Sequence, residues 1–99
     1  MEIGIKAIKF DATEKLQGFI QKKVTKLERL CGEIRKVEVS LKVVKPAAAL
    51  NKQVIIVASL PGEELIADKT CDTFEEATDQ CLAALEKQLA IYKEKQGKN

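Results

Sequence analysis

Apolar residues follow two different periods along this chain, and the order of these periods restricts the folds that it can adopt. They recur at every second residue in four segments, as expected for strands with one buried face. They recur at every third or fourth residue in two segments, as expected for amphipathic helices. The strand-like segments are 2–10, 34–45, 53–60 and 64–71, and the helix-like segments are 11–31 and 74–95. The sequence therefore predicts the order β-α-β-β-β-α.

Polar and turn-forming residues mark the ends of these segments. Asp11 is followed three residues later by Glu14, a capping-box arrangement that predicts the start of the first helix, with Thr13 as the alternative cap. Gly32 suits the left-handed position that often follows the end of a helix. The residues "PGEE" at 61–64 predict a turn between the third and fourth strands.

Similar residues mark the end of the second strand and the start of the last helix. Pro46 is expected to end the second strand, because proline cannot donate to the strand ladder. Thr73 and Glu76 form a second capping box at the start of the last helix.

These elements predict an α+β domain that spans residues 1–99. The first strand-helix-strand step is long enough for a right-handed crossover between parallel strands, and the three later strands can form an antiparallel meander. Each helix has one apolar stripe, so both helices should pack on one face of a four-stranded mixed sheet. The other face carries Glu38, Ser40 and Lys42 and is expected to be exposed.

The first helix carries a row of cations on the side opposite its apolar stripe. At 3.6 residues per turn, four of them fall within about 60° of one another on the helical wheel. These four are Lys15, Lys22, Lys26 and Arg29. No acidic residue lies at a spacing that would pair with Lys22, so the row is not neutralised within its own helix. Such a row, about 20 Å long, matches a polyanion backbone better than a point ligand. The alternative is a solvated face that serves only solubility.

Other cations indicate nucleic-acid binding less strongly than these four. Lys23 lies at the edge of the apolar stripe, where its methylene groups can pack while its charge reaches solvent. Lys87, Lys93 and Lys95 lie late in the last helix, where the helix dipole favours cations in any case. The strands between 34 and 71 have no aromatic residues on which unpaired bases could stack. Recognition of phosphates and duplex shape is therefore expected rather than recognition of bases.

Several other classes of function find no support in the sequence. The chain has no histidine, the commonest general base, and no P-loop, GxSxG or GxGxxG motif, so we expect neither an enzyme nor a cofactor-binding or small-molecule-binding protein. Cys31, Cys71 and Cys81 do not form a CxxC pair, so no metal site is expected and the three are interpreted as buried residues. Cys71 is the alternative candidate for a reactive thiol, because Lys69 and a following helix could lower its pKa.

The sequence shows no segment that would direct it to a membrane or out of the cell. No apolar run approaches the roughly 20 residues that a membrane-spanning helix needs. The first ten residues alternate in polarity and do not form the apolar core of a signal peptide. A cytoplasmic location is expected.

Three stretches of the chain resemble one protein family. "ATEKLQGFIQKKVTKLERL" resembles the first helix of the ribosome hibernation promoting factors and the related ribosome-associated inhibitor, protein Y, also known as sigma-54 modulation proteins. "VEVSLKVVK" resembles the second strand of that family, and "ADKTCDTFEEATDQCLAALEKQLAIYKEK" resembles its last strand and helix. The resemblance covers the whole chain, in order and spacing.

The resemblance implies a fold like a double-stranded-RNA-binding domain with an added first strand. It implies a translation inhibitor without catalytic activity, which binds the small ribosomal subunit through ribosomal RNA phosphates. Such a protein blocks the channel for mRNA and tRNA in starved or stationary bacteria. It also implies the short form, a monomer when free and without a C-terminal dimerisation domain. The alternative is a protein-interaction module that modulates a transcription factor of the sigma-54 type.

The resemblance also assigns RNA-binding positions. The matching residues are Lys23, Lys26, Lys87, Lys93 and Lys95. Ala84 and Ile91 depart from the pattern, because family members often carry lysine there, and Leu30 and Cys31 replace a common aromatic pair. The last helix is therefore less basic than in the family, and the remaining cations of the first helix are expected to compensate.

Overall fold

The computed structural model describes the backbone of residues 1–45 and 50–97 and the side chains of these residues as far as Lys95. Its elements are β1 (Glu2–Ile8), α1 (Glu14–Leu30), β2 (Lys36–Val43), β3 (Lys52–Leu60), β4 (Glu63–Cys71) and α2 (Phe74–Gly97). The predicted order β-α-β-β-β-α is confirmed. Pro46, which was expected to end the second strand, lies outside the described residues.

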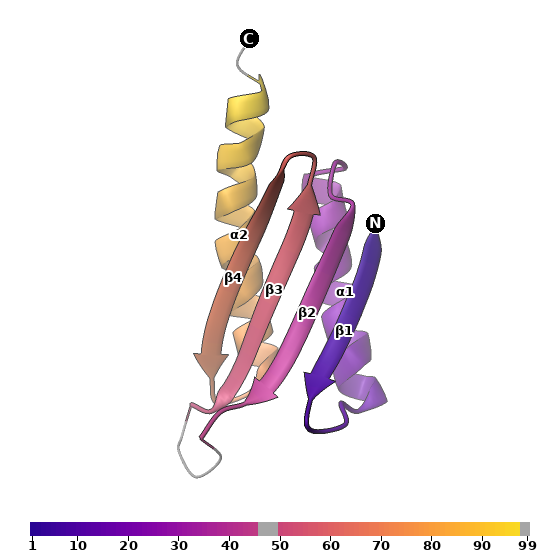
Figure 1. Cartoon of the computed structure of the whole chain (residues 1–99), viewed down its shortest axis with the longest axis vertical. Coiled ribbons are helices and arrows are strands. Elements are labelled where there is room, and N and C mark those ends of the chain that lie inside the picture. Colours follow the sequence, from indigo (N-terminus) through magenta and orange to yellow (C-terminus); the bar gives the residue numbers. More distant parts are fainter. Residues whose placement is uncertain (46–49, 98–99) are drawn as a thin grey trace.

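The four strands form one mixed sheet in the order β1-β2-β3-β4. β1 and β2 are parallel and are joined through α1, whereas β2, β3 and β4 form an antiparallel meander. The register places Ile5 beside Val39, Val39 beside Ile56, and Ile56 beside Ala67, so one apolar row crosses all four strands. Both helices lie behind this sheet, on the same side (Figure 1). The predicted fold class is therefore confirmed.

The core lies between the sheet and the two helices. Val39 and Ile56 on the strands are 1% and 0% exposed. Ile20 of α1 and Leu85 of α2, the two helices that cover this face of the sheet, are both 0% exposed. Burying each such side chain stabilises the fold by about 1.5–3 kcal/mol before the entropy of ordering is subtracted. The open face of the sheet is more polar, but Ile66 is exposed there. No helix among residues 1–45 and 50–97 is long and apolar enough to cross a membrane.

The N-cap of α1 is Thr13, not Asp11 as the capping-box pattern suggested. The Thr13 hydroxyl oxygen accepts a hydrogen bond from the Leu16 N–H at 3.1 Å, and Thr13 has the extended backbone of an N-cap. Glu14 is already the first helical residue, so it cannot serve as the third. At α2 the predicted cap is correct, because the Thr73 hydroxyl accepts from the Glu76 N–H at 3.1 Å.

The end of α1 differs from the expectation of a left-handed Gly32. The helix ends at Leu30, and the next residue, Cys31, has extended backbone with φ −151° and ψ 107°. Because the Cys31 side chain is buried, the extended backbone directs the chain back towards the core at once. The left-handed glycine is instead Gly62, with φ 75°, in the two-residue turn between β3 and β4.

The first strand is shorter than predicted, because Lys9 has φ 63° and turns the chain out of the sheet. Phe10 then stacks on Phe74 at the start of α2, with ring centroids 5.3 Å apart and planes within 6°. The aromatic contact links the β1–α1 connection to the first residue of α2.

The two candidate caps of α1 can be separated by mutation. Thr13→Ala should lower the free energy of unfolding by about 1 kcal/mol, because it removes the acceptor for the Leu16 N–H. Asp11→Ala serves as the control and should change the free energy of unfolding by less than about 0.5 kcal/mol. Urea denaturation of both variants measures the difference. A larger loss for Asp11→Ala would show that Asp11 caps the helix in solution.

Thr78 of α2 offers a second test of the core. Its side chain is 0% exposed, and among the described residues its hydroxyl has no hydrogen-bond partner. A buried hydroxyl without a partner costs about 1–3 kcal/mol. Thr78→Val, which replaces the hydroxyl with a methyl group, should leave the melting temperature unchanged or raise it.

Thr78→Ser is the matched control, because it keeps the hydroxyl and loses the methyl group. This variant should be less stable than the parent by about 1 kcal/mol. The reverse ranking, with serine tolerated and valine destabilising, would mean that the hydroxyl is hydrogen-bonded in solution.

Candidate nucleic-acid interface

The packing of α1 determines which of its side chains reach solvent. Ile20, Val24 and Leu27 are buried against the rest of the core, so the opposite side of the helix faces outwards. The four predicted cations all lie on this outer side and are exposed: Lys15, Lys22, Lys26 and Arg29. We call these four residues the α1 stripe.

The α1 stripe is not neutralised by its surroundings. Within residues 1–45 and 50–95, no acidic side chain forms an ion pair with any of its four cations. Glu28, an acid of the same helix, is paired with the amino group of Met1 at 3.4 Å. The positive potential along the outer side of α1 is therefore available to an external anion.

Part of the stripe surrounds a shallow hollow in the surface. Lys22, Thr25, Lys26 and Arg29 line a space of about 380 Å³. The Thr25 hydroxyl donates to the Gln21 carbonyl oxygen at 2.7 Å, as threonine often does within a helix. Three cations around one hollow can each donate hydrogen bonds to the oxygens of a phosphate group. Lys15 lies two turns earlier, about 10 Å along the helix axis from Lys22.

Lys23 differs from the α1 stripe because it is held between the two helices. Its Nζ lies 3.5 Å from Oδ1 of Asp79 on α2 and 5.4 Å from the centroid of the Phe19 ring. The ion pair and the cation–π contact explain its intermediate exposure, which agrees with its predicted place at the edge of the apolar stripe. The charge of Lys23 is therefore partly neutralised by Asp79.

Lys93 also has an internal role in the fold. Its Nζ donates to the carbonyl oxygen of Leu30 at 2.8 Å. That carbonyl belongs to the last turn of α1, where carbonyl groups have no partner within the helix and the helix dipole favours a cation. Lys93 therefore caps α1 from α2.

Lys87 and Lys95 lie away from the α1 stripe. They line hollows between α2 and β4, on the side of α2 that faces away from α1. Lys69 of β4 joins Lys87 there, a residue that sequence reasoning considered only as a neighbour of Cys71 and not as a binding residue. The signal was present, because Lys69 alternates in phase with Leu65 and Ala67 and so belongs to the helix-facing side of its strand.

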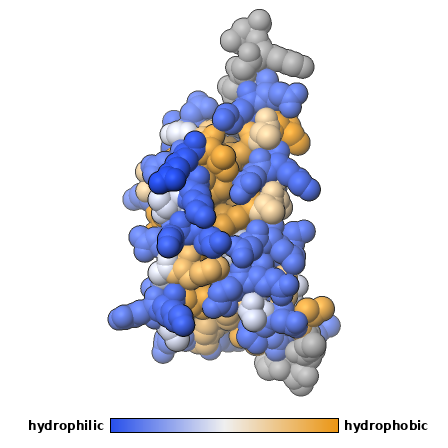
Figure 2. Space-filling model, turned by 180° about the vertical axis from the view of Figure 1, so that it is seen from behind, coloured by the Kyte–Doolittle hydropathy of each residue, from blue (hydrophilic) through white to orange (hydrophobic). Residues whose placement is uncertain are grey.

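A groove runs between the two helices. Figure 2 shows apolar surface along it, between two columns of hydrophilic side chains. The apolar residues that line it are Leu27, Leu30, Leu82, Ala83, Leu89 and Ala90. Asp79 and Glu86 lie among the lysines of this groove, so its charge is mixed. Lys26 of the α1 stripe borders this groove, whereas the hollow that Lys26 shares with Lys22 and Arg29 on the outer side of α1 has no acidic residue among the described residues that line it.

The cysteines do not offer a reactive thiol. All three are free and buried. Burial raises the pKa of the Cys71 thiol, with Glu76 and Asp72 adding to the rise and Lys69 opposing it. Lys69 does act to lower this pKa, but the expectation of a depressed pKa is wrong, because desolvation outweighs the lysine. Burial likewise raises the pKa of Cys81 to about 11. Among the described residues, no cluster of His, Cys, Asp and Glu could hold a metal ion.

Comparisons with known proteins agree with the fold and with the resemblance in sequence. The chain is 28% identical to a ribosome hibernation promoting factor of Azotobacter vinelandii, over 97% of this chain and 86% of the relative. It is also 28% identical to a ribosome hibernation promoting factor of Pseudomonas putida, over 97% of this chain and 90% of the relative.

Solved structures show the same architecture. A ribosomal subunit interface protein from Coxiella burnetii superimposes with a TM-score of 0.84 and 26% identity, covering 94% of this chain and 98% of that one. The N-terminal domain of Thermus thermophilus Protein Y shares the fold at 20% identity, with a TM-score of 0.77 over 93% of this chain and 99% of that one. A family model described as sigma 54 modulation protein / S30EA ribosomal protein matches residues 3–97. The chain belongs to the sigma 54 modulation protein / S30EA ribosomal protein family.

Proposed function

We propose that this protein is a cytoplasmic ribosome hibernation factor that binds the small ribosomal subunit through phosphates of ribosomal RNA. The observation that carries the proposal is the α1 stripe, a row of exposed cations without acidic partners among the described residues. The names of the relatives, which are hibernation promoting factors and a ribosomal subunit interface protein, support the ribosome as the partner.

The chemistry of the stripe favours RNA as the ligand. Lysine and arginine bind phosphate oxygens through charge-assisted hydrogen bonds, and each contact releases counterions from the nucleic acid. With four contacts, the logarithm of the binding constant should fall with the logarithm of salt concentration with a slope of about −3. Raising monovalent salt from 50 to 200 mM should therefore weaken binding about a hundredfold.

The proposed mechanism is occupation rather than catalysis. The protein sits in the channel for mRNA and tRNA, as family resemblance suggests, and its bulk prevents these ligands from entering. The exposed face of the sheet has no aromatic side chain among the described strands, so stacking on unpaired bases makes no contribution. Binding during starvation or stationary phase would then store ribosomes in an inactive state.

Charge reversal of the α1 stripe tests the proposal. The variant Lys22→Glu/Lys26→Glu/Arg29→Glu should bind purified small subunits at least tenfold more weakly in 100 mM salt, because three phosphate contacts become repulsive. Co-sedimentation over a range of salt concentrations measures both the affinity and its salt slope, which should become shallower by about 2–3.

The control makes the same change in net charge on the other face of the sheet. Lys6→Glu/Lys36→Glu/Lys42→Glu alters three lysines that are exposed there and should bind within about threefold of the parent. Equal losses in both variants would mean that only net charge matters. Undiminished binding of the α1 variant would disprove the role of the stripe. Salt-tolerant binding to a transcription factor, without ribosome binding, would favour the sigma-54 alternative.

The ion pair between Lys23 and Asp79 gives a second prediction for the same surface. Asp79→Asn should raise the affinity for small subunits about two- to fivefold at low salt, because it frees Lys23 and removes a negative charge beside α1. Glu64→Gln, the same charge change on the open face, is the control and should have a smaller effect. The exposed pair contributes less than about 1 kcal/mol to stability, so Asp79→Asn should fold normally. A fall in affinity would show that Asp79 positions Lys23 for binding.

A further inference from the structure

The sheet has a free edge at β4, and a groove lies beside this edge. Among the described strands, β4 pairs only with β3, and α2 runs behind it. Two hollows, of about 180 and 460 Å³, lie between this strand and α2 and share Gln88 in their walls. We call the combined space the edge groove. Its lining residues are Glu63, Leu65, Lys69, Gln80, Ala83, Ala84, Lys87, Gln88, Ile91, Tyr92 and Lys95.

Part of the backbone of β4 is available to a further strand, although the carbonyl oxygen of Ile66 already accepts a hydrogen bond from Gln88. Gln88 Nε2 donates to the carbonyl oxygen of Ile66 at 2.9 Å, so the backbone polar groups of Ile66 point away from β3. Outward-pointing residues alternate along an antiparallel strand, so Glu64 and Asp68 also present their N–H and C=O groups outwards. Among the described residues, no group donates to the carbonyls of Glu64 and Asp68 or accepts from their N–H groups.

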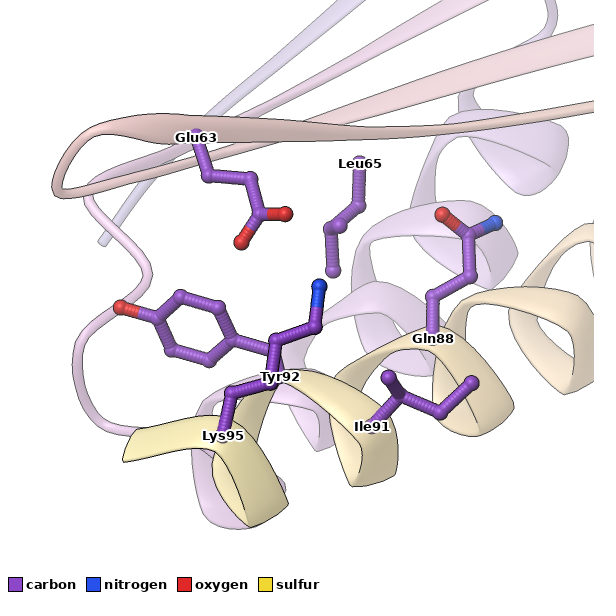
Figure 3. Close-up of a pocket in the computed structure, with 6 residues that line it drawn as sticks. All are labelled: Glu63, Leu65, Gln88, Ile91, Tyr92 and Lys95. Atoms are coloured by element: carbon purple, nitrogen blue, oxygen red, sulfur yellow. The ribbon is translucent and has the colours of Figure 1, made fainter. Parts of the chain in front are cut away.

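One end of the edge groove combines the apolar side chains of Leu65 and Ile91 with Glu63 and Lys95. Figure 3 shows Glu63 and Leu65 pointing from β4 towards α2, with Gln88, Ile91 and Lys95 along the facing side of the helix. Leu65 is buried under the strand, but Ile91 is 55% exposed. The fold itself does not require an exposed isoleucine at this position. An aliphatic side chain that entered here would cover Ile91 and the floor of the hollow.

The other end of the edge groove is basic. Lys69 from β4 and Lys87 from α2 both line the larger hollow, where Ala83 and Ala84 leave space between them. The charges on the open face of the same strand are opposite in sign, because Glu64 and Asp68 project there. A strand added beside β4 would therefore meet cations on one side and anions on the other.

We propose that the edge groove binds an extended segment of a partner protein as a fifth strand beside β4. Alternate side chains of this segment would face α2. An aliphatic side chain would fill the hollow at Leu65 and Ile91, and a carboxylate would lie between Lys69 and Lys87. Since Leu65 and Lys69 are four residues apart, about 13 Å along the strand, the two partner side chains are also four residues apart. Basic residues between them face Glu64 and Asp68.

The charges on the open face of β4 argue against a second copy of this chain as the occupant. In an antiparallel pair of β4 strands with Ile66 opposite Ile66, Glu64 of each copy would lie opposite Asp68 of the other on that face, whereas Glu63 would lie opposite Lys69 on the side that faces α2. Like charges directly opposite one another destabilise a strand pair, and natural edge strands use charges to prevent self-association. Nucleic acid fits the end at Leu65 and Ile91 poorly, because phosphate gains nothing from these two side chains and would meet Glu63 as well as Lys95 there.

Synthetic peptides test the proposal directly. Fluorescein-labelled KLKTKEK and its reverse, KEKTKLK, place leucine and glutamate four residues apart for the two possible strand directions. KLKTEKK, with the glutamate moved by one residue, has the same composition but presents its two key side chains on opposite faces. We expect saturable binding of one of the first two peptides, measured by fluorescence anisotropy, at least fivefold tighter than binding of KLKTEKK.

Two protein variants separate backbone pairing from simple charge attraction. Ile66→Pro removes an outward N–H without touching the ladder to β3 and should abolish binding, whereas Ile66→Ala keeps the N–H and should bind within about threefold of the parent. Lys69→Glu/Lys87→Glu should lose the original peptide and gain a peptide in which lysine replaces the glutamate. Circular dichroism confirms that each variant is folded.

Several outcomes would overturn the proposal. These are absence of saturable binding to either peptide by the folded parent protein, equal binding of KLKTEKK, and unchanged binding by Ile66→Pro. The proposal also fails if Lys69→Glu/Lys87→Glu weakens small-subunit binding as strongly as reversal of the α1 stripe, because the edge groove would then be part of the RNA-binding surface. Peptide binding that persists when the α1 stripe is reversed separates this proposal from the proposed ribosome function.

Discussion

Burial of one face of the sheet against two helices is the constraint on which the other features of this protein depend. The apolar row that crosses the strands at Ile5, Val39, Ile56 and Ala67 can be removed from water only if both helices lie on that side. This packing fixes the rotation of α1 about its own axis. The α1 stripe is therefore presented to solvent because the opposite side of the same helix is committed to the core.

The cations of this protein divide into those that hold the fold together and those that are free to act outside it. Lys23 pairs with Asp79, and Lys93 caps the last turn of α1, so both contribute to the contact between the two helices. The α1 stripe has no such partner among the described residues. A single basic helix can thus supply both a structural contact and a binding surface, because residues at adjacent positions point in directions about 100° apart.

The two proposed surfaces follow from different physical properties. The α1 stripe offers charge along the outer side of a helix, which suits a polyanion whose phosphates are spaced along a line. The edge groove offers unpaired backbone groups, an exposed isoleucine at Ile91 and two lysines at one end, which suits an extended peptide. Ala84 and Ile91 line the edge groove with uncharged side chains.

The sequence by itself determined the element order, the face of each strand that is buried and the position of the α1 stripe, because all three depend on local periodicity. It misplaced the N-cap of α1 at Asp11, because the helix begins at Glu14 and Thr13 is the cap. It also predicted a left-handed Gly32, whereas the chain leaves the helix through the extended backbone of Cys31, whose side chain is buried. The tertiary structure alone decided the partners of Lys23 and Lys93 and the meeting of Lys69 with Lys87. Lys93 and Leu30 are 63 positions apart, and no local pattern specifies which distant groups the packing of two helices on one sheet will bring together.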